Sequence, residues 1–177
     1  MSVFRLRTRS SAFCLHAVRR IILPNNIASF LVLDGYNLSG TFPTRISKLH
    51  SLTTLSLRDN HFRGVLPSEL VELNSLTVLR LNRNMFTGAV PPEWGDISEL
   101  KFLDIGGNLL TGTLVTTLGR LTNLENFWIE SNGFSGQLTI GVSPTANLSK
   151  SLYILARRRG LVNPTKYSYL ALLPSEL

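Results

Sequence analysis

The sequence predicts an α/β repeat solenoid, with short parallel strands on a concave face and irregular or short helical segments on a convex face. Three observations predict this class. An Asn recurs every 24 residues, at Asn60, Asn84, Asn108 and Asn132. A Leu-x-Leu type pair precedes each Asn, and its period of two points both side chains inward from a strand. A Gly, which indicates a tight bend, follows each Asn by four residues. A single turn of this kind cannot bury its apolar face, so the turns must stack.

Five turns of this period lie within residues 27–140. The inward strand pairs are Leu31 and Leu33, Leu55 and Leu57, Leu79 and Leu81, Leu103 and Ile105, and Phe127 and Ile129. Only the first turn departs at the Asn position, where it has Tyr36. A buried amide at the end of a strand can satisfy backbone groups of its own turn and of the adjacent one. The repeated Asn residues are therefore predicted to be structural rather than catalytic.

The strand motif L-x-x-L-x-L-x-x-N resembles the leucine-rich repeat family. Its continuation N-x-[LF]-x-G-x-Φ-P resembles the plant-type subclass, with Pro43, Pro67 and Pro91 at the last position. The fourth and fifth turns have Val115 and Thr139 there, so we expect a less regular convex side at that end. The resemblance implies the recognition part of a receptor-like system and an extracellular or cell-surface location. Nothing in the sequence resembles a kinase domain.

Charge separates the chain into three parts, which we take as its domain organisation. Residues 27–140, the repeats, carry a formal charge of −2, whereas the flanking residues 1–26 and 141–177 carry +5 and +4. The excess positive charge therefore lies outside the repeats, and no nucleic-acid recognition motif accompanies it. We expect no nucleic-acid partner. No apolar run approaches the roughly 18 residues that a membrane-spanning helix needs, so association with a membrane receptor would be needed for any membrane attachment.

The two flanks have different compositions. Residues 1–26 are Arg-rich and free of acidic residues, which leaves three interpretations open: a targeting peptide, a cap on the first repeat, or a disordered terminus. A transit peptide would indicate an organelle, so the compartment stays undecided among the cell surface, an organelle and the cytoplasm. Residues 141–177 are predicted to form a basic cap and tail. Within them, Leu148, Leu152 and Leu155 have helical spacing ahead of three Arg residues and Gly160.

The residues that usually carry catalysis are few and scattered. Cys14 is the single cysteine, so neither an intrachain disulfide nor a cysteine-based metal site can form. His16, His50 and His61 have no metal-ligand spacing. The sequence contains no Gly-rich phosphate loop and no nucleophile elbow. We therefore expect neither an enzyme nor a cofactor.

Residues that flank the inward pairs point to the concave side and form three rows across the turns. The candidate ligand-binding residues in these rows are Arg58, Arg80, Phe102, Asp104, Trp128 and Glu130. Aromatic and Arg side chains are enriched in interface anchors. Arg80 and Asp104 are expected to be lateral neighbours that can form an ion pair. These residues favour a module that binds a protein or peptide. The alternative is a structural wall or matrix protein without a specific ligand.

Two tripeptides match the N-glycosylation sequon. They begin at Asn37 and Asn147, whereas Asn163 is excluded because Pro164 follows it. Use of either site would depend on secretion of the protein.

Overall fold

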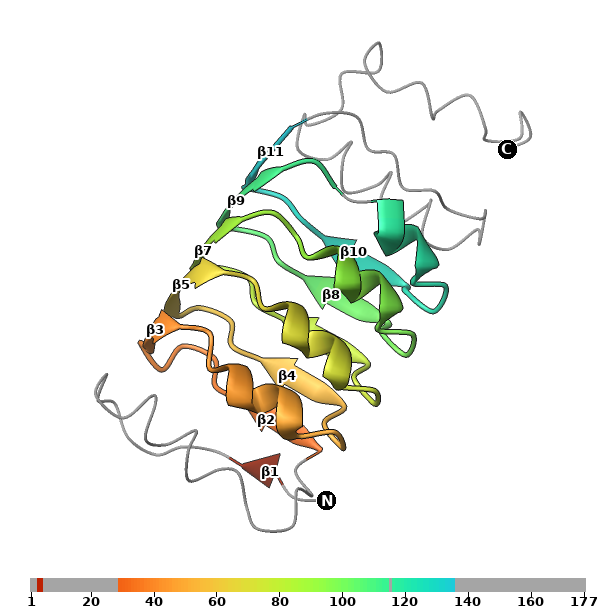
Figure 1. Ribbon diagram of the computed structural model, residues 1–177. Coiled ribbons are helices and arrows are strands. Elements are labelled where there is room, and N and C mark those ends of the chain that lie inside the picture. Colours follow the sequence, from red (N-terminus) through yellow and green to blue (C-terminus); the bar gives the residue numbers. More distant parts are fainter. Residues whose placement is uncertain (1–2, 5–28, 115, 136–177) are drawn as a thin grey trace, which may run out of the picture.

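The computed structural model describes residues 3–4, 29–114 and 116–135, which form a stack of five similar turns (Figure 1). The α/β solenoid that the sequence predicts is confirmed. The flanking segments predicted at 1–26 and 141–177 lie outside the described residues, except for Val3 and Phe4. The helical spacing around Leu148 also lies outside them. The boundaries of the three predicted parts therefore stay a prediction.

One face of the stack is a parallel sheet of six strands in the order β1-β2-β4-β6-β8-β10. Their bounds are β1 Val3–Phe4, β2 Phe30–Val32, β4 Thr54–Ser56, β6 Val78–Arg80, β8 Phe102–Asp104 and β10 Asn126–Trp128. From β2 to β10 each strand pairs with the strand one period later, so Leu31, Leu55, Leu79, Leu103 and Phe127 lie side by side. The Leu-x-Leu pairs thus all point to the same interior.

A second parallel sheet, which the sequence analysis did not predict, lies at another side of each turn (Figure 1). Its strands are β3 Ser39–Thr41, β5 His61–Val65, β7 Met85–Gly88, β9 Leu109–Gly112 and β11 Gly133–Phe134. The sequence analysis assigned the repeated Gly to a tight bend. Gly64 instead lies within β5 with φ of +88°, a conformation that favours glycine.

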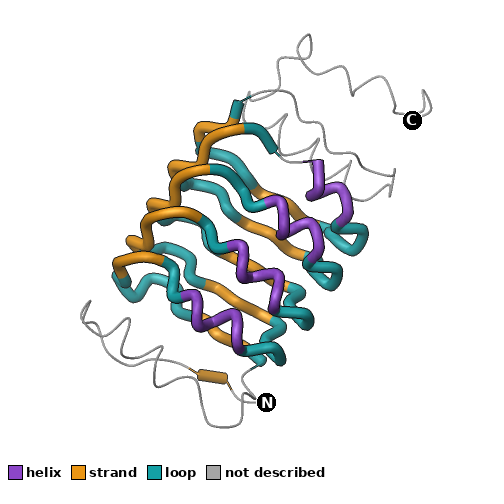
Figure 2. The backbone as a smooth tube through the Cα atoms, in the orientation of Figure 1, coloured by secondary structure: helices purple, strands orange, loops and turns teal. Residues whose placement is uncertain are grey.

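Among the described residues, the convex side carries four short 3-10 helices, one in each of the first four turns (Figure 2). They are η2 Thr44–Lys48, η3 Ser68–Glu72, η4 Pro92–Asp96 and η5 Thr116–Arg120. Pro43, Pro67 and Pro91 each precede a helix at its N-cap position, where a backbone N–H is not required. This agrees with the expected short helical segments.

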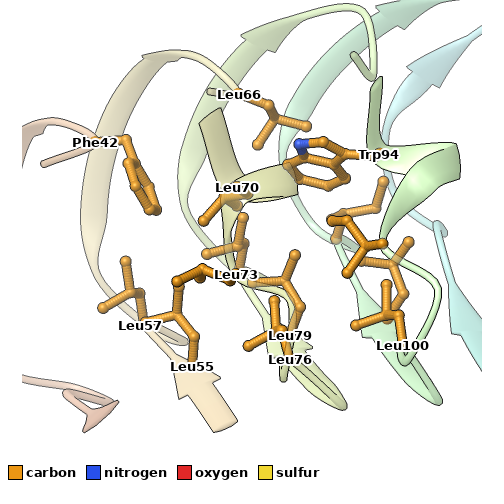
Figure 3. Packing of buried hydrophobic residues seen from close by; sticks show 14 of the residues in the cluster. Phe42, Leu55, Leu57, Leu66, Leu70, Leu73, Leu76, Leu79, Trp94 and Leu100 are labelled. Carbon is orange, nitrogen blue, oxygen red and sulfur yellow. The ribbon is translucent and has the colours of Figure 1, made fainter. Parts of the chain in front are cut away.

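The core runs continuously through the stack between the two sheets and the 3-10 helices (Figure 3). Leu55, Leu57, Leu79 and Leu81 have no exposed surface, as the inward pairs predict. Trp94 of η4 is also fully buried, and its indole Nε1–H donates to the carbonyl oxygen of Pro67 at 2.8 Å. This bond satisfies the one polar group of the largest core side chain.

The repeated Asn side chains form the ladder that the sequence predicts. Asn84 Oδ1 accepts from the backbone N–H of Phe62 at 3.0 Å, and Asn84 Nδ2 donates to the carbonyl oxygens of Leu57 and Leu81 at 2.9 and 3.1 Å. Asn60, Asn108 and Asn132 make the same set of bonds one period earlier or later. Each Asn thus joins its own turn to the preceding one.

The residue just before the Asn position adopts a left-handed conformation in every turn. Its φ is +70° at Gly35, +54° at Asp59, +55° at Arg83, +63° at Gly107 and +56° at Ser131. The backbone must reverse direction here to leave the concave strand. This turn brings Arg83 and Ser131 to the edge of the concave face, beside the ends of the strands.

Candidate ligand-binding face

The outward residues of the concave strands lie in the rows that the period predicts. The first row is Phe30, Thr54, Val78, Phe102 and Asn126, and the second is Val32, Ser56, Arg80, Asp104 and Trp128. Backbone hydrogen bonds between successive turns align the third row, which is Asp34, Arg58, Asn82, Gly106 and Glu130. All six candidate residues therefore lie on one face.

Three of the candidate side chains stack diagonally across neighbouring strands. The guanidinium carbon of Arg80 on β6 lies 4.6 Å from the ring centroid of Phe102 on β8. The Phe102 ring in turn lies 4.4 Å from the Trp128 ring on β10, with 36° between their planes. Both aromatic residues are half-buried. The stack thus holds the Trp128 ring against the Phe102 ring.

The ion pair expected between Arg80 and Asp104 is not formed. The two residues are lateral neighbours in the register of β6 and β8, as predicted. Arg80 nevertheless takes the position over Phe102, and none of the ion pairs among the described residues joins it to Asp104. A cation over an aromatic face contributes a free energy comparable to that of an exposed ion pair, so the ion pair has no advantage over this arrangement.

A hollow of about 260 Å³ opens at the carboxyl ends of the concave strands. Its lining residues come from four successive turns and are Arg58, Asn82, Arg83, Asp104, Gly106, Gly107, Trp128, Glu130 and Ser131. It brings together four of the six candidate residues. The other two, Arg80 and Phe102, are not lining residues, but their stack ends on Trp128, which forms part of the wall.

The two Arg residues of the hollow share one carboxylate, that of Asp59. Arg58 Nε donates to Asp59 Oδ2 at 2.6 Å, and Arg83 Nη1 lies 3.4 Å from Asp59 Oδ1. The hydrogen bond from Arg58 is the main reason that the pKa of Asp59 is lowered, and the positive charge of Arg83 adds to it. The backbone of Arg58 is held separately, because its N–H donates to Asp34 Oδ1 at 3.1 Å.

Asp104 is the most perturbed acid of the face. Burial raises its pKa to about 6 and the negative charge of Glu130 contributes to the rise, while the Gly106 N–H and the charges of Arg80 and Arg58 oppose it. The Gly106 N–H donates to Asp104 Oδ1 at 3.1 Å. Glu130 approaches the same place from the next turn, since a Cβ at Gly106 would lie 3.1 Å from Glu130 Cδ. Gly106 thus leaves the space that lets the two carboxylates approach.

The first sequon residue, Asn37, is exposed in the turn before β3 and has φ of +59°. Its Oδ1 lies 2.6 Å from His61 Nε2, and the amide nitrogen, the atom that a glycan would modify, takes no part in this contact. Asn147 lies outside the described residues. Glycosylation at Asn37 or Asn147 therefore stays a prediction.

The structure adds residues to the hollow that the sequence analysis did not select. Asn82 and Gly106 belong to the third concave row but have no charge or aromatic ring. Arg83 and Ser131 lie outside the rows, at the left-handed position before the Asn. The 24-residue period does identify that position, but the sequence alone did not show that it turns back toward the concave face.

Comparisons with known proteins agree with this architecture. The leucine-rich repeat family model matches residues 51–73, 75–97 and 99–121. One similar solved structure is the leucine-rich repeat ectodomain of the plant membrane receptor kinase GASSHO1/SCHENGEN3 from Arabidopsis thaliana, in complex with CASPARIAN STRIP INTEGRITY FACTOR 2. It is 30% identical with a TM-score of 0.62, over 64% of this chain and 14% of that one. This chain is a plant-type leucine-rich repeat protein.

Two further solved structures are similar to this chain. A chain of the BIR3–SERK2 complex from Arabidopsis thaliana is 29% identical with a TM-score of 0.60, over 62% of this chain and 58% of that one. A plant ice-binding protein is 30% identical with a TM-score of 0.56, over 57% and 33%. Our leucine-rich repeat protein thus spans less than two thirds of each of these chains. No curated protein sequence matches it.

In the described part of this leucine-rich repeat protein, the His, Cys, Asp and Glu residues do not gather in groups of three that could hold a metal ion. Within the same ranges, no helix has the length and apolar character that crossing a bilayer requires.

Proposed function

We propose that this chain is a non-catalytic module that binds a protein or peptide on its concave face, as the recognition part of a receptor-like system. The observation that carries the proposal is the Arg80–Phe102–Trp128 stack beside the hollow. The core does not use these side chains, yet they are held in fixed contact with one another. Aromatic and Arg residues that are held in place lose little conformational entropy when a partner binds.

The similar structures support this proposal. The GASSHO1/SCHENGEN3 ectodomain was solved in complex with CASPARIAN STRIP INTEGRITY FACTOR 2, and the BIR3–SERK2 structure is itself a complex. By analogy, the present chain would associate with a membrane receptor or a ligand. The fold alone does not decide between binding and other roles, because a plant ice-binding protein is also similar in structure. The argument therefore depends on the side chains of the concave face.

A selection experiment tests the proposal. The full chain is immobilised and used to select binders from a random peptide library, and the selected peptides are titrated against wild type and two variants. Trp128→Ala removes the end of the stack on the concave face. Glu69→Ala changes an exposed residue of η3 on the convex side and is the matched control.

We expect Trp128→Ala to weaken binding by about 1 kcal/mol or more, as for an interface anchor, and to leave the fold intact because Trp128 lies outside the core. Glu69→Ala should bind as wild type does. If only the convex change weakened binding, the concave face would not be the site. If the library gave no peptide that binds, a structural wall or matrix role would be the better explanation.

A further inference from the structure

We propose that the hollow beside Trp128 receives an arginine side chain of the bound peptide, with its guanidinium between the carboxylates of Asp104 and Glu130 and its plane against the indole. This inference rests on the proposed function, because it names the ligand chemistry of the same face.

The charges of the hollow favour a cation. Arg58 and Arg83 both line it, but their guanidinium groups are paired with Asp59 at 2.6 and 3.4 Å. Asp104, by contrast, has no cation within ion-pair distance among the described residues. Its negative charge is offset only by more distant Arg residues and by the Gly106 N–H. An anionic ligand would have to displace Asp59, whereas a cationic ligand would meet Asp104 directly.

The raised pKa of Asp104 also favours a positively charged ligand. Burial is its first cause and the negative charge of Glu130 also contributes, so the site already holds a proton more strongly than an ordinary Asp does. A bound cation relieves the same repulsion between the carboxylates that a proton relieves. The groups that face Asp104 and set this balance are Glu130, Arg80, Arg58 and the Gly106 backbone.

The aromatic wall favours a planar cation over a compact one. The Trp128 ring is held by Phe102, and Phe102 already carries the guanidinium of Arg80 at 4.6 Å from its centroid. The chain therefore shows the same kind of contact one strand away. A guanidinium can stack on an indole and bind a carboxylate through two parallel hydrogen bonds, which an ammonium cannot do.

The polar lining of the hollow is rich in acceptors. Asp104 and Glu130 supply carboxylate oxygens, and Asn82 adds an amide. The Oδ1 atom of Asn82 is buried without a hydrogen-bond partner among the described residues. A guanidinium has five N–H donors and no acceptor, so it complements this set.

The test uses a blocked tripeptide, acetyl-Gly-Arg-Gly-amide, as the probe. Its matched control replaces Arg by citrulline, which has a similar shape but no charge, and a second peptide has Lys instead. The full chain contains two Trp residues, so the indole N–H region of an NMR spectrum holds two signals. Trp94 is buried and hydrogen-bonded to Pro67, and it serves as an internal reference. A Trp128→Phe variant assigns the signals.

We expect the Arg peptide to shift the Trp128 signal and not the Trp94 signal, and the Lys peptide to bind more weakly. The isosteric changes Asp104→Asn and Glu130→Gln should each weaken binding about tenfold, as expected for loss of a charge-assisted hydrogen bond. Glu69→Gln on the convex side is the control and should bind as wild type does. Equal binding of the citrulline peptide, or unchanged binding by both acidic-site variants, would overturn the inference.

A pH series gives a second readout. A proton on Asp104 competes with the guanidinium, so wild-type binding should weaken as the pH falls through about 6. The Asp104→Asn variant, which has no such proton, should lose this dependence. The values pH 7 and pH 5 bracket the Asp104 pKa of about 6. If wild-type binding did not change between them, the assigned role of Asp104 would be contradicted.

The failure of this inference is distinguishable from the failure of the proposed function. Library peptides that depend on Trp128 but show no enrichment of Arg would leave the concave face as the binding site and overturn the arginine assignment. Peptides that bind independently of Trp128 would overturn the proposed function itself.

Discussion

Among single residues, the ladder Asn is expected to have a large effect on stability. Asn84 is buried and satisfies one backbone donor and at least two backbone acceptors in two turns. Asn84→Ala would leave these groups buried without partners. We expect a loss of about 2 to 5 kcal/mol in the free energy of unfolding, measured by urea denaturation. The exposed Asn74 is the control, and Asn74→Ala should change stability by no more than about 0.5 kcal/mol.

Asp104 predicts a dependence of stability on pH. Its folded-state pKa of about 6 is raised above the ordinary value of 3.8, so the folded state binds the proton more strongly. The charged form therefore destabilises the fold above about pH 6, and this cost disappears as the pH falls toward 3.8. We expect Asp104→Asn to stabilise the protein by about 1 to 2 kcal/mol at pH 7, after allowance for solvent screening.

The measurement is urea denaturation of wild type and Asp104→Asn at several pH values. The difference in unfolding free energy between the two proteins should shrink as the pH is lowered from 7 to 4, which spans the raised pKa of Asp104. Asp59 and Glu72 have lowered pKa values and affect both proteins equally, so the difference isolates Asp104. A constant difference at every pH would contradict a raised pKa.

At the scale of the element, each concave strand contributes two side chains to the core. Leu79 and Leu81 of the β6 turn have no exposed surface and lie between equivalent Leu or Ile residues of the adjacent turns. Leu79→Ala or Leu81→Ala should cost about 2 to 5 kcal/mol, because the packed row cannot collapse fully onto the cavity. Thermal and urea unfolding would measure the loss. Near-zero effects at both positions would be incompatible with this packing.

The elements also show what the sequence could predict. Strand positions such as Leu79, and ladder positions such as Asn84, recur in every turn, so the period identifies them. The second sheet was missed because β5 alternates exposed His61 and Arg63 with only one large buried side chain, Phe62, and its Gly64 was interpreted as a bend. In the site, the period located Arg80 and Asp104 correctly but not the rotamer that places Arg80 over Phe102. That choice depends on a diagonal neighbour from another turn.

At the scale of the whole molecule, the repeats are expected to fold without the N-terminal segment. Val3 and Phe4 pair with β2 at the edge of the concave sheet, but the described core begins only at Leu31. Deleting residues 1–20 should therefore leave a cooperative unfolding transition. Circular dichroism with thermal unfolding of the shortened chain would measure this. Loss of the transition would show that the segment is a cap that the first turn requires.

The ladder also sets an order of events during synthesis of the chain. Asn60 accepts from the N–H of Leu38, and each later Asn serves a residue 22 positions before it. A turn therefore cannot satisfy its buried N–H until most of the next turn has left the ribosome. Folding of the stack must follow translation with a delay of about one turn, from the first repeat to the last. The N–H that each Asn will accept from stays hydrated in the nascent chain until the next turn arrives.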